Sequence, residues 1–443
     1  MQRCCSKFLT SELQFGFKAK CSTNMCSLVL KETLLYYSNN ESSVYCTFLD
    51  ATKAFDRVHY CKLFSLLIKR GLPPYIVRLL INMYTGHNVR VCWHGVMSNY
   101  FVAANGVKKG GVLSPVLFCI YIDNLLYSLK QAGIGCFIGS NFVGSLAYAD
   151  DLVLLAPSPS ALRKMLLICD AYALEYNILF NASKSKCIVV LPPSRRYLTT
   201  IVKTCTFYVG GCEIEIVDSW LHLGNTFNCR LDDADEINNK RNSLVGHINA
   251  LLCYFGKLDP VVKNNLLKAY CSSMYGCEIW HLEHEMIKQY CIAWRKGQRR
   301  IWGLPNNTHN ELLPIVCTSL PVFDEICKRF LGFIYKCMSH ESELIRFVVR
   351  HGILFARTRS VIGLNLIFCS RRYSFRIDDF IDGNISNTTV VNYCIKSVSD
   401  NTVNTGLFLL EAVALRNGVF SLSGNVTVNR DDINDIIVHL ATS

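Results

Sequence analysis

The sequence lacks any long uncharged apolar run. Its most apolar long window, residues 112–129, is interrupted by Asp123 and Asn124 and is preceded by Lys108 and Lys109. A membrane-spanning helix needs about 20 consecutive, mostly apolar residues. We therefore expect no transmembrane segment and no membrane partner.

Targeting sequences, internal repeats and low-complexity tracts are also missing. The chain opens with MQRCC and runs at once into QFGF at residues 14–17, with no leader ahead of it. The 23 cysteines are scattered without regular spacing. Without a secretion signal, such cysteines are typical of reduced thiols that serve as small core residues. The sequence therefore predicts an intracellular protein of the nucleus and cytoplasm.

Acidic residues are fewer than basic ones, 34 against 46, which gives a formal net charge of +12. A moderate basic excess favours a polyanionic partner such as nucleic acid, but it also fits an ordinary basic protein and decides nothing alone. Because 51% of the residues are hydrophobic, a disordered chain is excluded. At 443 residues the chain has room for two or three domains.

The first half of the chain mixes strand and helix patterns. A β-branched and aromatic run at residues 44–49 predicts a buried strand that ends at Asp50. Serine caps followed by proline predict helices that begin at Ser114 and Ser158. Helical spacing of apolar residues predicts two more helices, at residues 61–70 and 74–84. Further strands are predicted at residues 88–95, 98–105, 142–148, 152–156, 187–191, 206–209 and 213–217.

After about residue 233 the pattern changes to helices, predicted at residues 237–252, 260–275 and 285–301. We therefore place a domain boundary near Leu231, which separates residues 1–231 from a helical region at 232–340. Beyond about His340 the pattern is irregular, and residues 341–443 receive no predicted role.

Two adjacent carboxylates, Asp150 and Asp151, lie at the tip of a strand-turn-strand pattern at residues 147–155. Unpaired charge between buried strands is costly, so a divalent metal is the economical explanation. Alone the pair is weak evidence, since aspartate favours turns for backbone reasons. Asp50 ends a strand, and one antiparallel sheet could bring all three carboxylates together. Such carboxylates, with substrate phosphates, hold Mg²⁺, and two such ions can stabilise a phosphoryl displacement.

Three segments, in this order, resemble motifs of reverse transcriptases. FLDATKAFDRV at residues 48–58 resembles motif A, GVKKGGVLSPVLF at 106–118 resembles motif B, and YADD at 148–151 resembles motif C. The family variant most resembled is that of non-LTR (LINE-like, jockey-type) retrotransposons. Residues 14–17, with Ser22 and Thr23, are similar to the first family motif, and residues 179–186 resemble motif D. Residues 221–225 resemble the primer-grip region, and residues 275–280 resemble the thumb.

The resemblance covers about residues 14–320 and implies a fold and a reaction. The fold would be α+β, a right-hand polymerase with an antiparallel palm sheet, partial fingers and a helical thumb. The reaction would be RNA-directed DNA synthesis, which adds dNTPs to the 3′-hydroxyl of a DNA primer on an RNA template. No stable protein partner is expected. Because the first motif begins at Gln14, the chain resembles an N-terminally truncated piece of an element's polyprotein.

The resemblance also implies roles for individual residues. Asp50, Asp150 and Asp151 would hold two Mg²⁺ ions, with the Ala51 backbone carbonyl as a further metal ligand. Otherwise these aspartates are turn residues and a solvated strand-end charge. Phe55 would lie under the incoming sugar and exclude a 2′-hydroxyl, although an ordinary core phenylalanine is the alternative. Tyr148 is assigned to substrate binding, and so is Ala51.

Residues of motifs B and D are expected near the nucleotide. Gly110 and Gly111 would let the backbone approach nucleotide and template closely, or would simply form a strand-to-helix turn. Lys109 stands where the family usually has glutamine, and it could meet a phosphate only as a point charge. Lys184 would act near the leaving pyrophosphate, although lysines in polar loops are commonly just solvated.

Two later clusters have competing interpretations. Basic and aromatic residues alternate at residues 294–302, which suits a thumb helix that follows a duplex backbone or a solvated helix face with buried tryptophans. The basic residues are Arg295, Lys296, Arg299 and Arg300. A zinc site is disfavoured by helical periodicity and by the lack of a C-x₂-C pair. Its four ligands would have been Cys277, His281, His284 and Cys291.

The alternative function is a catalytically dead, nucleic-acid-binding remnant of such an element. Lys109 and the short sequence ahead of Gln14 motivate this alternative. It would bind primer-template duplex without metal-dependent synthesis.

Overall fold

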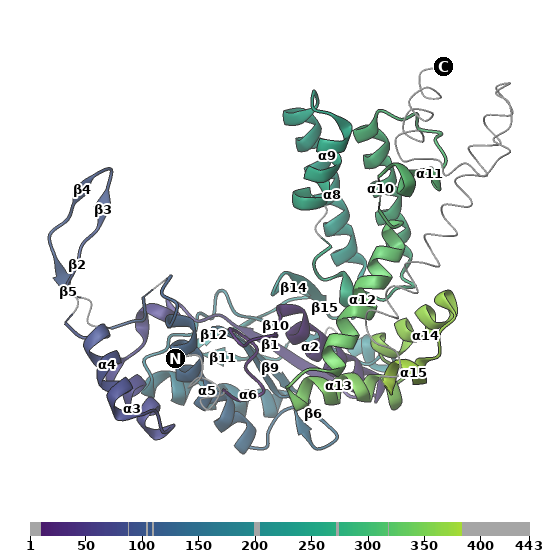
Figure 1. The fold of residues 1–443 in the computed structure, drawn as a ribbon. Helices are drawn as coiled ribbons and strands as arrows, with labels where there is room; N and C mark the ends of the chain where they lie inside the picture. The colour runs from purple at the N-terminus through teal and green to yellow at the C-terminus, as the bar shows by residue number, and fades with distance from the viewer. Residues whose placement is uncertain are drawn as a thin grey trace, which may run out of the picture. The chain divides into compact units, whose positions relative to one another are not determined.

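The computed structural model describes residues 10–86, 88–102, 105–108, 110–198, 204–271, 274–317 and 319–382. These residues divide into two compact units (Figure 1). The first comprises the described residues up to Leu231 together with His340–Ser360, and the second comprises Asp232–Ser339 and the described residues from Val361 onward.

A five-stranded sheet forms the centre of the first unit, in the order β13-β10-β1-β9-β8. The central strand β1 runs antiparallel to both neighbours and pairs Leu49 with Leu152 and Val44 with Val190. All of its residues are buried, which explains its continuous β-branched and aromatic sequence. The strands are β1 (Val44–Leu49), β8 (Ser145–Tyr148), β9 (Asp151–Ala156), β10 (Lys186–Val190) and β13 (Glu215–Ile216).

Four helices support this sheet. α5 packs on β8 and α6 on β9, while α2 contacts β1 and β8 and is itself covered by α13 (Figure 1). The sequence dictates the start of α6, because the Ser158 hydroxyl accepts a hydrogen bond from the Ala161 amide and Pro159 is the first helical residue. The helices are α2 (Thr23–Asn39), α5 (Ser114–Gln131), α6 (Pro159–Glu175) and α13 (Glu343–Leu354).

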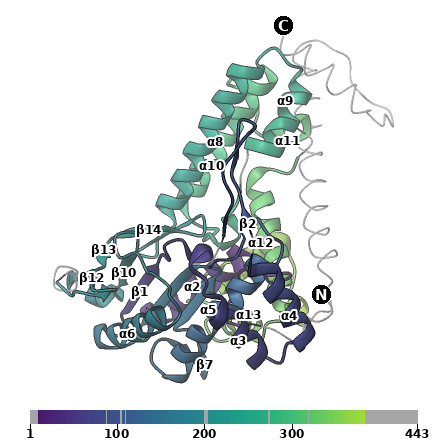
Figure 2. The same cartoon turned by 90° about the vertical axis from the view of Figure 1, so that its left-hand side faces the viewer.

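Between β1 and α5 the chain forms two helices and a long hairpin. Figures 1 and 2 show the hairpin extending away from α3 and α4. The expected strand pair is thus confirmed, although each arm is interrupted and all of the strand residues except Val89 are exposed. These elements are α3 (Tyr60–Lys69), α4 (Pro74–Tyr84), β2 (Asn88–Val89), β3 (Cys92–Trp93), β4 (Val96–Met97) and β5 (Phe101–Val102).

Short elements complete the first unit. Two short 3₁₀ segments and three small hairpins lie between the larger elements. They are the 3₁₀ turns η1 (Ala54–Arg57) and η2 (Pro193–Leu198), and the pairs β6 (Phe137–Ile138) with β7 (Asn141–Phe142), β11 (Tyr208–Val209) with β12 (Cys212–Glu213), and β14 (Ser219–His222) with β15 (Asn225–Asn228).

The second unit is helical. α8 and α10 pack side by side, and Gly297 permits the close approach, since a Cβ atom there would lie 2.3 Å from the Ile248 Cδ1 atom. Trp280 and Tyr290 are fully buried and form an edge-to-face pair. The helices are α8 (Ala234–Phe255), α9 (Pro260–Leu266), η3 (Leu267–Cys271), η4 (Cys277–Ile279), α10 (Glu285–Trp302), α11 (Leu312–Val316), α12 (Val322–Met338), α14 (Val361–Tyr373) and α15 (Ile377–Ile381).

Three local predictions were wrong. Ser114 is not a cap: Leu113 holds that position, and Ser114 is buried as the first residue of α5. The helix expected at residues 260–275 ends earlier, because α9 passes into a π-helical turn at Leu267. Beyond His340 the chain is helical rather than irregular as far as the described residues reach, with α13, α14 and α15.

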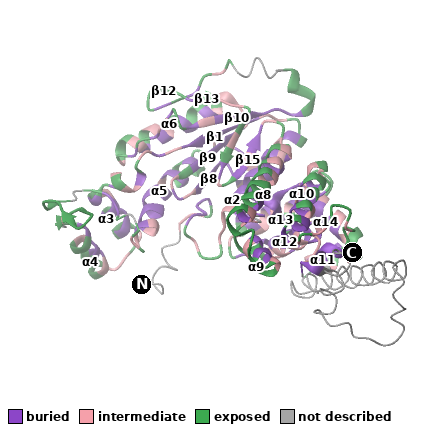
Figure 3. Ribbon diagram, turned by 90° about the horizontal axis from the view of Figure 1, so that it is seen from above, coloured by how far each residue is buried: buried purple, intermediate pink, exposed green. Residues whose placement is uncertain are grey.

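The buried residues of the first unit lie along its central strands and on the helices α2 and α5 (Figure 3). Several cysteines belong to this core, including Cys46 in β1 and Cys169 in α6, and burial raises the pKa of both thiols. They act as small apolar residues, as the sequence predicts. Among the described helices, none combines the length and the apolar character that crossing a membrane requires.

Truncating the sheet core should destabilise the first unit. Leu154 in β9 has 0% exposure, so Leu154→Ala should lower the free energy of unfolding by about 2–5 kcal/mol. Leu174→Ala is the matched control, since Leu174 is 89% exposed and should cost almost nothing. Urea denaturation followed by circular dichroism measures both. Equal losses for the two variants would contradict this assignment of the core.

Candidate active site

The register of the central sheet brings the three aspartates to one end. β1 pairs with β9 through Leu49 and Leu152, so one further step of the same register sets Asp50 opposite Asp151. Asp150 lies in the two-residue turn between β8 and β9, next to the closing pair of Tyr148 and Asp151. Strand ends far apart in the sequence thus form one carboxylate cluster.

The charges of this cluster oppose one another. Loss of water around the carboxyl raises the pKa of Asp151 to about 6, and the charges of Asp150 and Asp50 add to the shift. The pKa of Asp150 is also raised, mainly by burial and further by Asp50, while its own backbone amide opposes the shift. A bound cation would relieve this repulsion. The donor set, three hard carboxylate oxygen ligands, fits Mg²⁺.

The protein alone does not build a closed metal cage there. Among the described residues, no three His, Cys, Asp or Glu side chains are grouped tightly enough to hold a metal ion by themselves. Mg²⁺ usually keeps several waters and takes further ligands from substrate phosphates, so an open carboxylate cluster is compatible with it.

A polar loop after α6 is hydrogen-bonded to the backbone of Asp50. The Asp50 carbonyl accepts a hydrogen bond from the Asn181 amide at 2.8 Å, and the Asp50 amide donates to the Ser185 hydroxyl at 3.1 Å. Ala51 forms an isolated bridge with Phe180. Lys184 is on this same loop with an exposed side chain. Lys184 is therefore adjacent in the chain to Ser185, which is hydrogen-bonded to Asp50 of the carboxylate cluster.

The turn after Asp50 is joined to the loop that precedes α5. The Phe55 carbonyl accepts a hydrogen bond from the Val107 amide at 2.8 Å, and the Val58 carbonyl accepts one from the Gly106 amide at 2.9 Å. Phe55 is half-buried and its ring stacks on Phe118, with 4.8 Å between centroids. Phe55 is therefore anchored by packing on one side and partly exposed on the other.

The two glycines before α5 differ from each other. Gly110 is exposed at φ +79°, and a Cβ atom there would meet no other atom within 4 Å, so only its backbone conformation requires glycine. At Gly111 a Cβ atom would lie 2.8 Å from the Ser114 hydroxyl oxygen and 3.0 Å from the Lys108 carbonyl oxygen. Gly111 is thus required by a tight turn at the start of α5. Lys109 lies outside the described residues.

Comparison with known proteins gives the same family as the motifs. The family model described as "Reverse transcriptase (RNA-dependent DNA polymerase)" matches residues 1–213. Residues 1–213 are a reverse transcriptase domain. Four strands of the central sheet, β1, β8, β9 and β10, lie within this domain, and the family generally uses divalent metal ions. The resemblance inferred from the ordered motifs is thereby confirmed, and so is an α+β polymerase fold.

The similar curated proteins come from non-LTR retrotransposons. The Pol polyprotein of the type-2 retrotransposable element R2DM of Drosophila melanogaster is 32% identical over 45% of this chain and 19% of that protein. The probable RNA-directed DNA polymerase of the fly X-element is 26% identical over 76% of this chain and 37% of that protein. The polymerase of the fly mobile element jockey is 25% identical over 66% of this chain and 32% of that protein. The chain thus spans well under half the length of these relatives.

Among solved structures, apo telomerase from Candida tropicalis aligns with 78% of this chain and 56% of that chain, at 12% identity and a TM-score of 0.38. A score this low does not define a common fold beyond the family match.

The basic residues of α10 fall into two classes. Lys296 and Arg300 are exposed and line a groove of about 440 Å³ with Arg241 of α8. Arg299 was expected to contact nucleic acid, but it is buried. Its guanidinium donates to the Thr308 carbonyl at 2.6 Å and to the Asn310 side chain at 2.8 Å. Helical periodicity explains the difference, because neighbouring residues point about 100° apart around the axis.

Arg295 is half-buried, and Trp294 beside it is buried. The cluster at residues 294–302 therefore combines the two interpretations of the sequence. Its tryptophan and Arg299 stabilise the helical unit, while Lys296 and Arg300 form an exposed basic pair.

Three of the four residues considered for zinc have other roles. His284 caps α10 by accepting a hydrogen bond from the Met286 amide, and its other ring nitrogen lies 3.0 Å from an Asp232 carboxylate oxygen. Cys277 and Cys291 are buried, which raises the pKa of both thiols. These contacts agree with the sequence argument against a zinc site.

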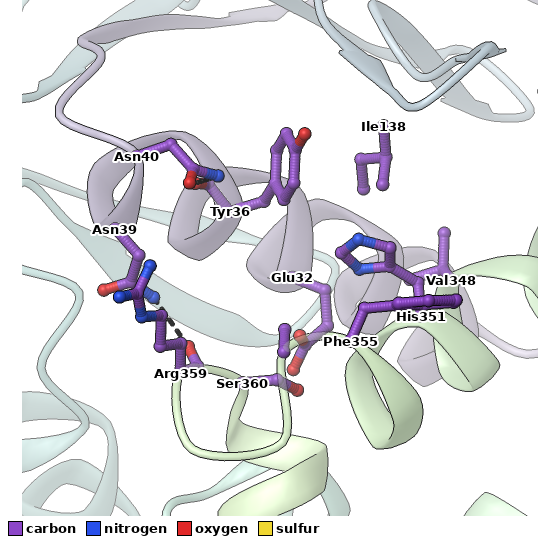
Figure 4. Close-up of a pocket in the computed structure, with 11 residues that line it drawn as sticks. Glu32, Tyr36, Asn39, Asn40, Ile138, Val348, His351, Phe355, Arg359 and Ser360 are labelled. Carbon is purple, nitrogen blue, oxygen red and sulfur yellow. Dashed lines mark hydrogen bonds between the residues drawn. The ribbon is translucent and has the colours of Figure 1, made fainter.

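A separate small pocket of about 100 Å³ lies between α2 and the end of α13 (Figure 4). Its lining includes Tyr36, His351 and Arg359, and the Asn39 side chain donates to the Arg359 carbonyl at 2.6 Å. None of the three site aspartates lines it, so this pocket is not part of the carboxylate cluster.

The absence of acidic residues from one long segment is a signal that the motif comparison did not use. Residues 57–122, which include α3, α4 and the hairpin, contain no aspartate or glutamate. The basic residues of this segment are Arg57, Lys62, Lys69, Arg70, Arg78, Arg90, Lys108 and Lys109. On the exposed hairpin, Arg90 lies over the Tyr100 ring at 5.1 Å and Trp93 is 73% exposed. Exposed aromatic and basic side chains suit single-stranded nucleic acid.

The carboxylate cluster predicts a pH-dependent response to metal. Because the folded-state pKa of Asp151 is raised to about 6, the metal-free folded protein binds this proton more tightly than the unfolded chain does. The resulting stability is present below the ordinary carboxyl pKa and is lost as pH rises through about 6. Mg²⁺ competes with that proton. Its stabilising effect on the midpoint of thermal unfolding should therefore be larger at about pH 7.5 than at about pH 5.

Asp151→Asn should raise the midpoint of thermal unfolding of the metal-free protein at about pH 7.5, and it should remove most of the increase that Mg²⁺ causes. Asp170→Asn, which alters a carboxylate on α6 that binds the Gly210 amide, is the control and should keep the response. Scanning fluorimetry with and without Mg²⁺ measures all three proteins. An equal Mg²⁺ effect at both pH values in the unmodified chain would show that the cluster does not bind the metal.

Proposed function

We propose that this chain is an RNA-directed DNA polymerase of a non-LTR retrotransposon, which adds dNTPs to the 3′-hydroxyl of a DNA primer on an RNA template. The observation that carries the proposal is the convergence of Asp50, Asp150 and Asp151 at one end of the palm sheet, within a reverse transcriptase domain. Neighbouring carboxyl groups with raised pKa values, such as Asp150 and Asp151, are typical of functional sites rather than of stabilising ones.

The aspartates would hold two Mg²⁺ ions, with the Ala51 carbonyl as a further ligand. Bound Mg²⁺ would activate the primer 3′-hydroxyl and neutralise charge on the triphosphate. The contribution of the protein is then mainly positioning, because phosphoryl transfer needs little covalent work from side chains. Here β1 fixes Asp50, and the β8-β9 turn fixes the other two carboxylates.

Other residues would position the nucleotide. Phe55, held against Phe118 with one face accessible, is suited to lie under the sugar and exclude a 2′-hydroxyl. Exposed Gly110 offers backbone to the nucleotide or template, and Tyr148 borders the aspartate turn. Lys184 is exposed on the loop that binds Asp50, and its charge would act near the leaving pyrophosphate.

Primer extension tests this function directly. The purified chain should extend an oligo(dT) primer on poly(rA) with Mg²⁺, and Asp150→Asn should reduce synthesis by at least about a thousandfold, since it removes charge that is needed to bind the metal. Asp170→Asn, the matched control, should retain activity. A well-folded chain that binds primer-template but incorporates nothing would instead identify it as a non-catalytic remnant.

We also propose that the α8-α10 groove contacts the phosphate backbone of the primer-template duplex. Lys296→Ala and Arg300→Ala should each weaken duplex binding and reduce the slope of log affinity against log salt by roughly one. Arg299→Ala should instead lower thermal stability, because it removes buried hydrogen bonds to Thr308 and Asn310. Fluorescence anisotropy at several salt concentrations measures the slopes. An unchanged slope in the Lys296 and Arg300 variants would assign the groove to another role.

A further inference from the structure

We propose that Gln14 is a positioning residue for the catalytic carboxylates, acting through the backbone of Ala149. The inference rests on the proposed polymerase function for its catalytic consequence. Its structural consequence, an ordered Asp150-Asp151 turn that binds metal, can be measured without synthesis.

The side chain of Gln14 binds both polar groups of the Ala149 backbone. Its Oε1 atom accepts a hydrogen bond from the Ala149 amide at 2.9 Å, and its Nε2 atom donates to the Ala149 carbonyl at 3.4 Å. The same Oε1 atom also accepts from the Gly16 amide at 2.8 Å. Gln14 is only 1% exposed, so these contacts are shielded from water. The buried side-chain amide of Gln14 thus binds both the backbone amide and the backbone carbonyl of Ala149, the residue that precedes the aspartate pair.

Ala149 needs such support because its backbone is strained. Its φ angle is +59°, a left-handed conformation in which the Cβ atom of an L-residue approaches the following carbonyl oxygen. Such conformations persist only where surrounding contacts determine them, and they cluster at functional sites. If this residue relaxed, the direction of the chain at Asp150 and Asp151 would change. The two hydrogen bonds from Gln14 oppose that relaxation.

The main chain around Gln14 is itself fixed. Gln14 forms a parallel bridge with Ala147, in which the Phe15 amide donates to the Ala147 carbonyl at 2.7 Å and the Ala147 amide donates to the Leu13 carbonyl at 2.8 Å. Gly16 permits the close approach, since a Cβ atom there would lie 2.4 Å from the Ala149 nitrogen. The first-unit segment that contains Gln14 is therefore aligned along β8 up to the turn.

A second anchor fixes the beginning of that segment. Asp123 of α5 is buried, and its carboxylate accepts a hydrogen bond from the Ser11 amide at 2.7 Å and forms an ion pair with Arg70 at 2.8 Å. This gives a role to the acidic residue that interrupts an otherwise apolar helix. The main chain is thus fixed on both sides of Gln14, at Ser11 by Asp123 and at Phe15 by Ala147.

Few side chains can replace glutamine here. The contacts require one acceptor and one donor on a planar group at this reach, and among unbranched side chains of glutamine's length only an amide or a protonated carboxyl supplies both. Ionised glutamate would keep the acceptor, lose the donor and add a negative charge beside the three aspartates. Methionine fills a similar volume but leaves the buried Ala149 amide without this acceptor.

The test compares Gln14→Met and Gln14→Glu with Tyr172→Phe in the full chain. Tyr172→Phe is the stability control, because it removes a buried hydrogen bond to the Tyr121 carbonyl in the same unit. Three quantities are measured: Mn²⁺ affinity by electron paramagnetic resonance, amide exchange of the peptide that contains Ala149, and the kcat and KM of primer extension.

We expect Gln14→Met to weaken Mn²⁺ binding and to lower kcat, each by about 10-fold or more, with little change in the KM for dNTP. Exchange around Ala149 should accelerate. Gln14→Glu should show a milder exchange effect, since it keeps the acceptor. Adding Ala149→Gly to Gln14→Met should recover part of the Mn²⁺ affinity, because glycine adopts the left-handed conformation without the Cβ clash. Tyr172→Phe should lower the midpoint of thermal unfolding without changing Mn²⁺ affinity, kcat or exchange around Ala149.

Unchanged Mn²⁺ affinity in Gln14→Met, together with a loss of stability like that of Tyr172→Phe, would overturn the proposal and leave Gln14 a structural residue. Fast exchange of the Ala149 amide in the unmodified chain would also overturn it, even if the Gln14 variants fail to fold. If the unmodified chain binds Mn²⁺ but synthesises no DNA, the polymerase function fails, while the metal-binding and exchange measurements still decide the role of Gln14.

Discussion

Mutual repulsion among three carboxylates is the constraint on which this structure depends. The sheet register and the β8-β9 turn bring Asp50, Asp150 and Asp151 together, although burial and like charge raise the pKa of the last two. Such a cluster weakens the protein without a cation, so the surrounding scaffold must hold it in place. A fully buried β1, paired on both sides, provides that rigidity.

The scaffold acts on the aspartates through their backbones. Asn181 and Ser185 bind the main chain of Asp50, and Gln14 binds the main chain of Ala149. In the proposed function the carboxylate groups bind metal, and these backbone contacts fix their positions. Contacts through the backbone also explain why Gln14 and Ser185 are polar but buried, since the side chain of each satisfies a backbone group.

In the helical unit, one helix, α10, likewise carries some basic residues that stabilise the fold and others that are exposed. Arg299 satisfies the backbone carbonyl of Thr308 and the side-chain oxygen of Asn310, whereas Lys296 and Arg300 remain on the groove surface with Arg241. Four basic residues that look equivalent in the sequence thus differ in role. Gly297 contributes to the groove in another way, by letting α10 approach Ile248 of α8.

The sequence by itself determined the strand before Asp50, the start of α6 and the order of the family motifs, because these depend on local periodicity, capping and turn chemistry. It also singled out Asp50, Asp150 and Asp151, which the sheet register brings to one end of the sheet. Tertiary structure alone decided that Asp50 faces Asp151, that Arg299 is buried and that Gln14 reaches Ala149, 135 positions away in the chain. These contacts depend on sheet register and on the rotation of helices against their neighbours. No local pattern encodes such long-range pairings, so only the folded chain reveals which polar residues support the aspartate cluster and which ones are exposed.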